Sequence, residues 1–247
     1  LVTIASGAGI SAQAWAQDAV KDSGLVCSPQ GVVAVAHPLA AEAGMKMLRL
    51  GGNAVDAAVA AAFAVGVVEP DGSGLGGGGG MVIVLNDTKA EHYINYYQQA
   101  PADVNKLNYN PDTDRHTGKS VLVPGTVAGL LMALEQFGTL SRETVMEPAI
   151  RLAEEGFPCD RTLAQLVLDN MTLLQKHDST AAVFLDEGFP RMEGDLILQP
   201  ALGRTLREIA TSGRDGFYKG EVANTIIAEV NRLGGALTAA DFAAYEP

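Results

Sequence analysis

The chain has 247 residues, of which 47% are hydrophobic and 19% are charged, and its formal net charge is −12 at pH 7. This composition is typical of a globular protein with a substantial buried core and excludes a disordered chain. The acidic balance, with no run of basic residues to offset it, argues against a nucleic-acid partner because phosphate contacts need clustered Lys and Arg.

Cysteine and histidine usage offers no metal-binding pattern. Cys27 and Cys159 lie outside any C-x-x-C pair. Two interpretations of the cysteines are open: one disulfide, or two unrelated buried thiols. The second interpretation is favoured. The four histidines are scattered, without an H-E-x-x-H motif or a Cys/His cluster. The sequence therefore predicts no metal site.

The first 16 residues resemble the end of a secretory signal peptide. The stretch is small, apolar and uncharged, and it closes on Ala14-Trp15-Ala16, the A-x-A pattern of cleavage sites. The alternative is an N-terminal arm without stable structure. We expect a signal-peptide remnant over 1–16 and a partial domain over 17–247. The best later apolar stretch, 54–68, is short and interrupted by Asp56, so no membrane span is expected in the mature chain.

The next elements are a strand and two helices. The β-branched run 31–37 predicts a buried strand, and Pro38 suits the first turn of a helix over 38–50 that Gly51-Gly52 ends. Asn53 can cap a second helix over 54–68, which is alanine-rich and apolar on nearly every face. Such a helix is expected to be buried centrally.

A glycine run over 72–80 then leads into an apolar strand over 81–85, expected to be buried, with 91–97 as its hairpin partner. Residues 99–121 are rich in loops. The rest predicts helices over 124–138, 141–157, 162–177, 199–213, 220–235 and 238–247. Strand-rich and helix-rich parts are thus partly segregated, which favours a layered α/β or α+β fold.

The glycine run places seven glycines in nine positions and satisfies G-x-G-x-x-G at Gly72, Gly74 and Gly77. In a dinucleotide-binding site the residues after this pattern form the first turn of a helix, whereas here they form a strand. No Gly-Lys-Ser/Thr ends the run, so it is not a P-loop, and no nucleotide cofactor is expected. Because glycine has no side chain, the backbone here instead allows another surface, such as a strand or a substrate, to approach closely.

The long stretch GGNAVDAAVAAAFAVGVVEPDGSGLGGGGGMVIV resembles the signature of the γ-glutamyltranspeptidases, and PGTVAGLLMALEQFGTL and LGGALTAADFAAYEP match in the same order. The resemblance covers about 31–247. It implies an α+β, N-terminal nucleophile hydrolase fold, an αββα sandwich, of which this chain is the large-subunit portion with a helix-rich second half. It also implies a periplasmic or secreted proenzyme that needs no cofactor.

Enzymes of this family cleave themselves before a threonine, which becomes the nucleophile and, through its α-amino group, its own base. A γ-glutamyl amide then forms an acyl-enzyme that passes to water or an amino acid. The resemblance implies that this threonine lies downstream of Pro247, so that no catalytic residue is assigned within the chain and a small subunit is its expected partner. The fragment alone is expected to be inactive. The glycines Gly76, Gly77, Gly78 and Gly79 are expected near the active centre.

The sequence departs from the family pattern at two places. The first bears on the substrate, and the second either widens a pocket or only loosens the loop. The family usually carries Arg-Glu-x-Ala-Pro after the hairpin, and its Arg holds the α-carboxylate of the glutamyl group. Aligned on Ala100-Pro101, Tyr97 stands at the Arg position and Gln98 at the Glu position. Both can hydrogen-bond a carboxylate but cannot neutralise it, which weakens binding by about 1.5–3 kcal/mol. The second departure is Gly80, where the family commonly has a bulky aromatic residue.

Three functions therefore remain open. The first is γ-glutamyl transfer or hydrolysis on glutathione-type amides, with Tyr97 and Gln98 as substrate-binding residues. The second is a related acylase or amidohydrolase with a non-glutamyl substrate, and the third is a non-catalytic family member. Asp56 and His37 are interpreted as helix caps rather than catalytic groups. Glu69 and Asp71 flank the loop and are expected to order it or to be solvated.

Overall fold

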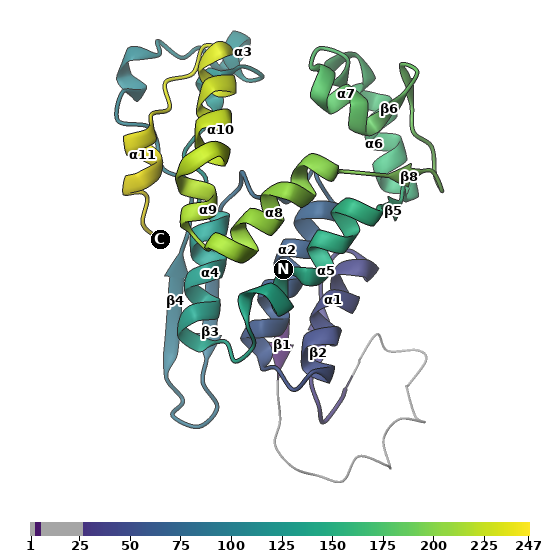
Figure 1. The fold of residues 1–247 in the computed structure, drawn as a ribbon, viewed down its shortest axis with the longest axis vertical. Coiled ribbons are helices and arrows are strands. Elements are labelled where there is room, and N and C mark those ends of the chain that lie inside the picture. The colour runs from purple at the N-terminus through teal and green to yellow at the C-terminus, as the bar shows by residue number, and fades with distance from the viewer. Residues whose placement is uncertain (1–2, 6–26) are drawn as a thin grey trace.

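The computed structural model describes residues 3–5 and 27–247 (Figure 1). Within these ranges the strands form four separate antiparallel pairs among many helices. The first pair joins β1 (Thr3–Ala5) to β2 (Val32–Ala34). Apart from Thr3–Ala5, the expected signal-peptide remnant over 1–16 lies outside the described residues. The strand predicted over 31–37 is shorter than expected, and its side chains are half-buried or exposed rather than buried.

Two capped helices follow, as predicted. Helix α1 (Pro38–Arg49) begins after His37, whose Nδ1 accepts from the Leu39 N–H at 3.1 Å. Helix α2 (Ala54–Val68) begins with a capping box in which the side chains of Asn53 and Asp56 bind each other's backbone N–H groups. Most of α2 is buried, and it packs against α1, α4 and α5. The apolar sequence thus places α2 in the core, as expected.

Three further helices complete this core: α4 (Thr126–Phe137), α5 (Arg142–Glu155) and α8 (Pro200–Ser212). Ser141 caps α5, which continues through Pro148. Helix α5 packs against α2 on one side and α8 on the other (Figure 1). All three lie where the helical spacing of apolar residues predicts them.

Two further groups of elements reach the top of Figure 1, and both also contribute buried residues to the core. One contains β5 (Phe157–Pro158), α6 (Arg161–Leu174), α7 (Asp178–Phe184), β6 (Leu185–Asp186), β7 (Phe189–Pro190) and β8 (Leu196–Ile197). The other contains the short helices η1 (Val104–Lys106), α3 (Pro111–Asp114), η2 (Gly118–Ser120) and α9 (Asp215–Tyr218), and helices α10 (Gly220–Arg232) and α11 (Ala239–Ala244). The sequence did not predict α7 or the two-residue strands. The pairing of β5 with β8 depends on residues forty positions apart, whereas β6 and β7 form a tight hairpin around Glu187 and Gly188.

The predicted hairpin consists of β3 (Gly80–Val84) and β4 (Glu91–Asn95). Its inner face is covered, with Ile83 and Ile94 buried in the core. On the outer face Val82, Val84 and Tyr93 are 70%, 59% and 63% exposed. The expectation of a buried strand over 81–85 was therefore wrong for one face, because successive side chains alternate and the described elements cover only the inner one.

The cysteines are two free thiols, as the favoured alternative predicts, but only Cys159 is buried and Cys27 is exposed. Burial raises the pKa of the Cys159 thiol, so it remains protonated at neutral pH. Among the helices described in residues 27–247, none has the length and apolar character needed to cross a membrane.

Candidate functional site

The glycine loop runs from the end of α2 to β3 and lies between β4 and the start of α4. Gly79 and Tyr96 exchange backbone hydrogen bonds of 3.2 and 2.8 Å, which extend the hairpin ladder by one pair. The N–H groups of Gly125 and Thr126 donate to the Gly77 carbonyl oxygen at 2.9 and 3.1 Å. The loop is therefore fixed at both sides by backbone hydrogen bonds rather than left free.

Bare backbone is needed at particular positions of this loop. A Cβ on Gly78 would lie 2.7 Å from the Tyr96 carbonyl oxygen and 2.8 Å from both the backbone nitrogen and Oε1 of Gln98. A Cβ on Gly79 would lie 3.1 Å from the Tyr96 ring. At Gly76, by contrast, no atom lies within 4 Å of that position. The glycines thus allow the loop to lie close against the 96–98 segment, and the approach is closest at Gly78.

The loop encloses a hollow of about 430 Å³ on the protein surface. Its lining is mostly backbone, and Asp71 is the one ionisable residue in it: Pro70, Asp71, Gly72, Ser73, Gly74, Gly76, Gly77, Gly78 and Thr126. Thr126 begins α4, and its Oγ1 lies 3.4 Å from the position of a Gly77 Cβ. The hollow therefore offers backbone polar groups, the hydroxyls of Ser73 and Thr126, and the Asp71 carboxyl group to a small polar ligand.

The two residues expected to bind substrate have different positions. Gln98 is half-buried, and its side-chain oxygen contacts Gly78 at the loop. The Tyr97 side chain is 62% exposed, while its carbonyl oxygen accepts from the Tyr245 hydroxyl at 2.8 Å. The structure thus brings Gln98 to the glycine loop and leaves the Tyr97 ring in contact with solvent.

Tyr96 is a site residue that sequence reasoning missed. It packs on the glycines Gly79, Gly125 and Gly129. A Cβ on Gly125 or Gly129 would clash with Tyr96, and a Cβ on Gly79 would make a tight contact with its ring. Burial raises the pKa of the Tyr96 phenol, and the neighbouring phenols raise it further. Tyr96 is therefore neutral at physiological pH. The four-residue spacing of Gly125 and Gly129, which puts both on one helix face, was the signal available in the sequence.

Gly80, at the start of β3, is covered by a residue of the neighbouring strand. Tyr93 stands diagonally across the ladder from Gly80 on the outer face. A Cβ on Gly80 would lie 2.6 Å from the Tyr93 hydroxyl and 2.9 Å from its Cε2. The ring covers the bare backbone, as aromatic residues do for glycines in other sheets.

Of the carboxylates and the histidine considered from the sequence, all but Asp71 lie outside the lining of the hollow. Asp56 is fully buried and accepts from Asn53, Thr139 and Leu140, which gives it a structural role. His37 caps α1, and its Nε2 lies 3.8 Å from Asp160. Glu69 is the C-cap of α2. Of the residues considered, only Asp71 lines the hollow.

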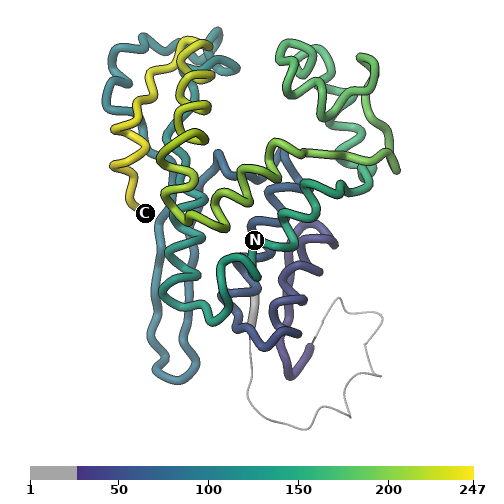
Figure 2. The backbone as a smooth tube through the Cα atoms, viewed as in Figure 1, coloured from purple at the N-terminus to yellow at the C-terminus, as the bar shows by residue number. Residues whose placement is uncertain are grey.

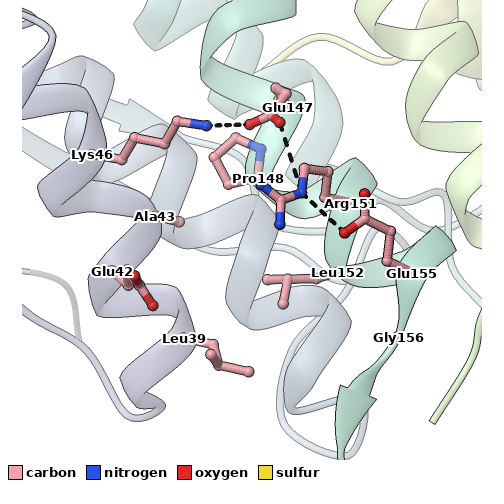
Figure 3. A pocket seen from close by; sticks show the side chains of 10 residues that line it. All are labelled: Leu39, Glu42, Ala43, Lys46, Glu147, Pro148, Arg151, Leu152, Glu155 and Gly156. Atoms are coloured by element: carbon pink, nitrogen blue, oxygen red, sulfur yellow. Dashed lines mark hydrogen bonds and ion pairs between the residues drawn. The ribbon is translucent and has the colours of Figure 1, made fainter. Parts of the chain in front are cut away.

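A second hollow, of about 200 Å³, lies between α1 and α5 (Figure 3). Its cations are already paired with carboxylates: Lys46 lies 2.5 Å from Glu147, and Arg151 lies 3.2 Å from Glu155. This groove is a surface ion-pair cluster, remote in sequence from the glycine loop. We therefore assign the candidate site to the loop.

The described elements share their arrangement with solved structures of the N-terminal nucleophile hydrolase fold. Helicobacter pylori gamma-glutamyltranspeptidase, at 34% identity, matches 90% of this chain and 66% of its own with a TM-score of 0.84. A cephalosporin acylase from Bacillus halodurans, at 32% identity, matches 85% of this chain and 41% of its own with a TM-score of 0.77.

The sequence comparison narrows the class to a family. The family model for gamma-glutamyltranspeptidase matches residues 40–247, and the chain belongs to that family. The glutathione hydrolase proenzyme of Bacillus subtilis (strain 168) is 43% identical over 226 residues, which make up 87% of this chain and 38% of the relative. The chain thus spans little more than a third of that relative. The expected fold class and family are confirmed.

Proposed function

We propose that this chain is the large-subunit portion of a self-processing enzyme that cleaves γ-glutamyl amides of the glutathione type. The nucleophile is a threonine beyond Pro247 whose α-amino group is freed by self-cleavage. Its hydroxyl attacks the amide carbonyl, the amine leaves with a proton, and the acyl-enzyme passes the γ-glutamyl group to water or to an amino acid. The 247-residue chain alone is then inactive.

The contact of Gln98 with Gly78 is the observation that supports this function best. It places a side-chain amide at the tightest point of the glycine loop, beside a hollow lined by backbone. An amide can donate to the α-carboxylate of a glutamyl group and accept from its α-ammonium. Neither Tyr97 nor Gln98 carries a cationic group, so the charge of that carboxylate must be balanced by another residue.

A charge restored at position 97 is expected to strengthen γ-glutamyl binding. In the full-length matured protein, Tyr97→Arg should raise kcat/KM for γ-glutamyl-p-nitroanilide by about 10- to 100-fold, the value of a charge-assisted hydrogen bond. Uncharged acyl anilides should not gain. Tyr109→Arg is the matched control, because Tyr109 is also an exposed tyrosine but lies in the loop before α3.

An equal gain in both variants would point to net charge rather than to a site at position 97. Turnover of uncharged acyl anilides without turnover of the γ-glutamyl compound would instead favour an acylase with a non-glutamyl substrate. The neutral pair at 97–98 and the likeness to a cephalosporin acylase support that second candidate. No turnover of any amide would leave a non-catalytic family member.

The outer face of the hairpin is the proposed docking surface for the small subunit. Val82, Val84 and Tyr93 form an apolar strip on two paired strands, an arrangement that a neighbouring layer normally covers. In the full-length protein, Val82→Lys is expected to weaken association of the processed subunits at least tenfold. Leu50→Lys, at an exposed position beyond α1, should not. Analytical ultracentrifugation measures both, and equal association of the two variants would exclude the hairpin face.

Export to the periplasm or the medium is proposed from the signal-like residues 1–16 and from the family. Amino-terminal sequencing of the mature protein and fractionation of the producing cells test it. A mature chain that begins near Gln17 in the exported fraction is the expected result. Retention of residues 1–16 in a cytoplasmic protein would contradict it.

A further inference from the structure

The end of the chain holds the segment that carries the proposed substrate-binding residues. Three hydrogen bonds join residues 241–246 to residues 97–102. The Tyr245 hydroxyl donates to the Tyr97 carbonyl oxygen at 2.8 Å, and Gln99 Nε2 donates to the Glu246 carbonyl oxygen at 3.2 Å. The Ala102 N–H donates to Asp241 Oδ1 at 2.9 Å. Figure 2 shows the last residues running down beside the strand that leads into this segment.

Tyr245 is the buried member of this contact. Its side chain is 1% exposed, and its ring stacks on Tyr218 with centroids 5.7 Å apart and planes 5° from parallel. Arg214 donates to the Tyr245 carbonyl oxygen, lies over the Tyr218 ring at 5.0 Å, and is 3.5 Å from Glu246. The Tyr245 hydroxyl is thus fixed by its ring, its backbone and the residue that follows it.

The position of Gly125 brings this hydroxyl into the site. A Cβ on Gly125 would clash with both the Tyr245 hydroxyl and the Tyr96 carbonyl oxygen. Gly125 also donates to Gly77 in the glycine loop. The start of α4, the glycine loop and the 97–102 segment therefore meet at one point, and the Tyr245 hydroxyl occupies the space that the missing Cβ leaves.

We infer that Tyr245 is a positioning residue, which sets the backbone of Tyr97 and Gln98 against the glycine loop without touching substrate. This inference rests on the proposed function for the part that concerns substrate. Gln98 follows directly on the carbonyl that Tyr245 holds, so the hydrogen bond restricts where the Gln98 amide lies. Its loss frees the 97–102 segment and weakens ground-state binding of substrate more than it slows the chemical step.

Tyr245→Phe in the full-length matured protein tests the inference, because it removes the hydroxyl and keeps the stacked ring. Hydrogen–deuterium exchange of the 97–102 amides should rise about 3- to 10-fold. KM for the amide that the wild type turns over best should rise about 3- to 10-fold, with kcat changed less than twofold. Tyr109→Phe, which removes an exposed phenol far along the loop, controls for both measurements.

Unchanged exchange in Tyr245→Phe would overturn the inference whatever the activity. Raised exchange with an unchanged KM, or with a loss of kcat alone, would also overturn it, because the hydrogen bond would then serve stability only. A wild type that turns over no amide would reject the proposed function instead. In that case the exchange comparison still decides whether Tyr245 holds the segment.

Discussion

Asp56→Ala is expected to lower the free energy of unfolding by about 3–5 kcal/mol, a loss at the high end for a single substitution. The Asp56 carboxylate is fully buried and no cation faces it among the described residues. It accepts from the backbone N–H groups of Asn53, Thr139 and Leu140 at 2.7, 2.9 and 3.1 Å, and from the Thr139 hydroxyl at 2.7 Å. Alanine would leave these donors, which are partly buried, without the acceptor that they share.

Urea unfolding of the full-length protein, followed by circular dichroism, measures this loss. Asp87→Ala is the control, since Asp87 is exposed in the hairpin turn and should change the free energy of unfolding by less than about 0.5 kcal/mol. Asp56→Asn keeps the shape but replaces one acceptor oxygen with a donor, and should fall between the two. A loss below about 1 kcal/mol in Asp56→Ala would show that water or backbone shifts satisfy the donors.

Gly78→Ala is expected to destabilise the protein by about 1–3 kcal/mol, the cost of overpacking. Its Cβ would meet the Tyr96 carbonyl oxygen and the Gln98 backbone, neither of which is the end of a flexible side chain. The 96–98 segment must then move away from the loop, and kcat/KM should fall about 100-fold because the Gln98 amide is displaced.

Gly76→Ala is the matched comparison for stability within the same loop. The Gly76 Cβ position is in open space and its backbone is not in the left-handed region, so the melting temperature should be unchanged or slightly higher. Differential scanning calorimetry compares the two variants. Equal stability would mean that the loop yields easily and that bare backbone at Gly78 is not required.

Elements set by neighbouring residues were predictable from the sequence. Asn53 and Asp56 stand three residues apart, which specifies a capping box, and Thr238 with Asp241 does the same before α11. The helices follow from apolar spacing over many residues. The strands β5 and β8 could not be predicted, because two residues carry no period and Phe157 pairs with Ile197, forty positions away.

The candidate site divides in the same way. The sequence alone shows the glycine run and the strand that follows it, where a nucleotide-binding loop would need a helix. It also shows the uncharged residues at positions 97 and 98. The place of Tyr96 on Gly129, and the hydrogen bond from Tyr245 to a residue 148 positions earlier, are not visible in the sequence, since both depend on how α4 and the end of the chain pack. The exposure of the Val82 side chain was also not predicted, because the residues that specify a strand do not specify whether a second layer covers its face.

The Tyr93 ring that covers Gly80 affects how substitutions at either position change this hairpin. Because Tyr93 fills the space beside Gly80 from the adjacent strand, neither position can be judged alone. A large residue introduced at Gly80 must displace the exposed Tyr93 ring, so the effects of substitutions at the two sites are expected to be coupled in a double mutant. Gly80 and Tyr93 thus share one space on the outer face of the hairpin.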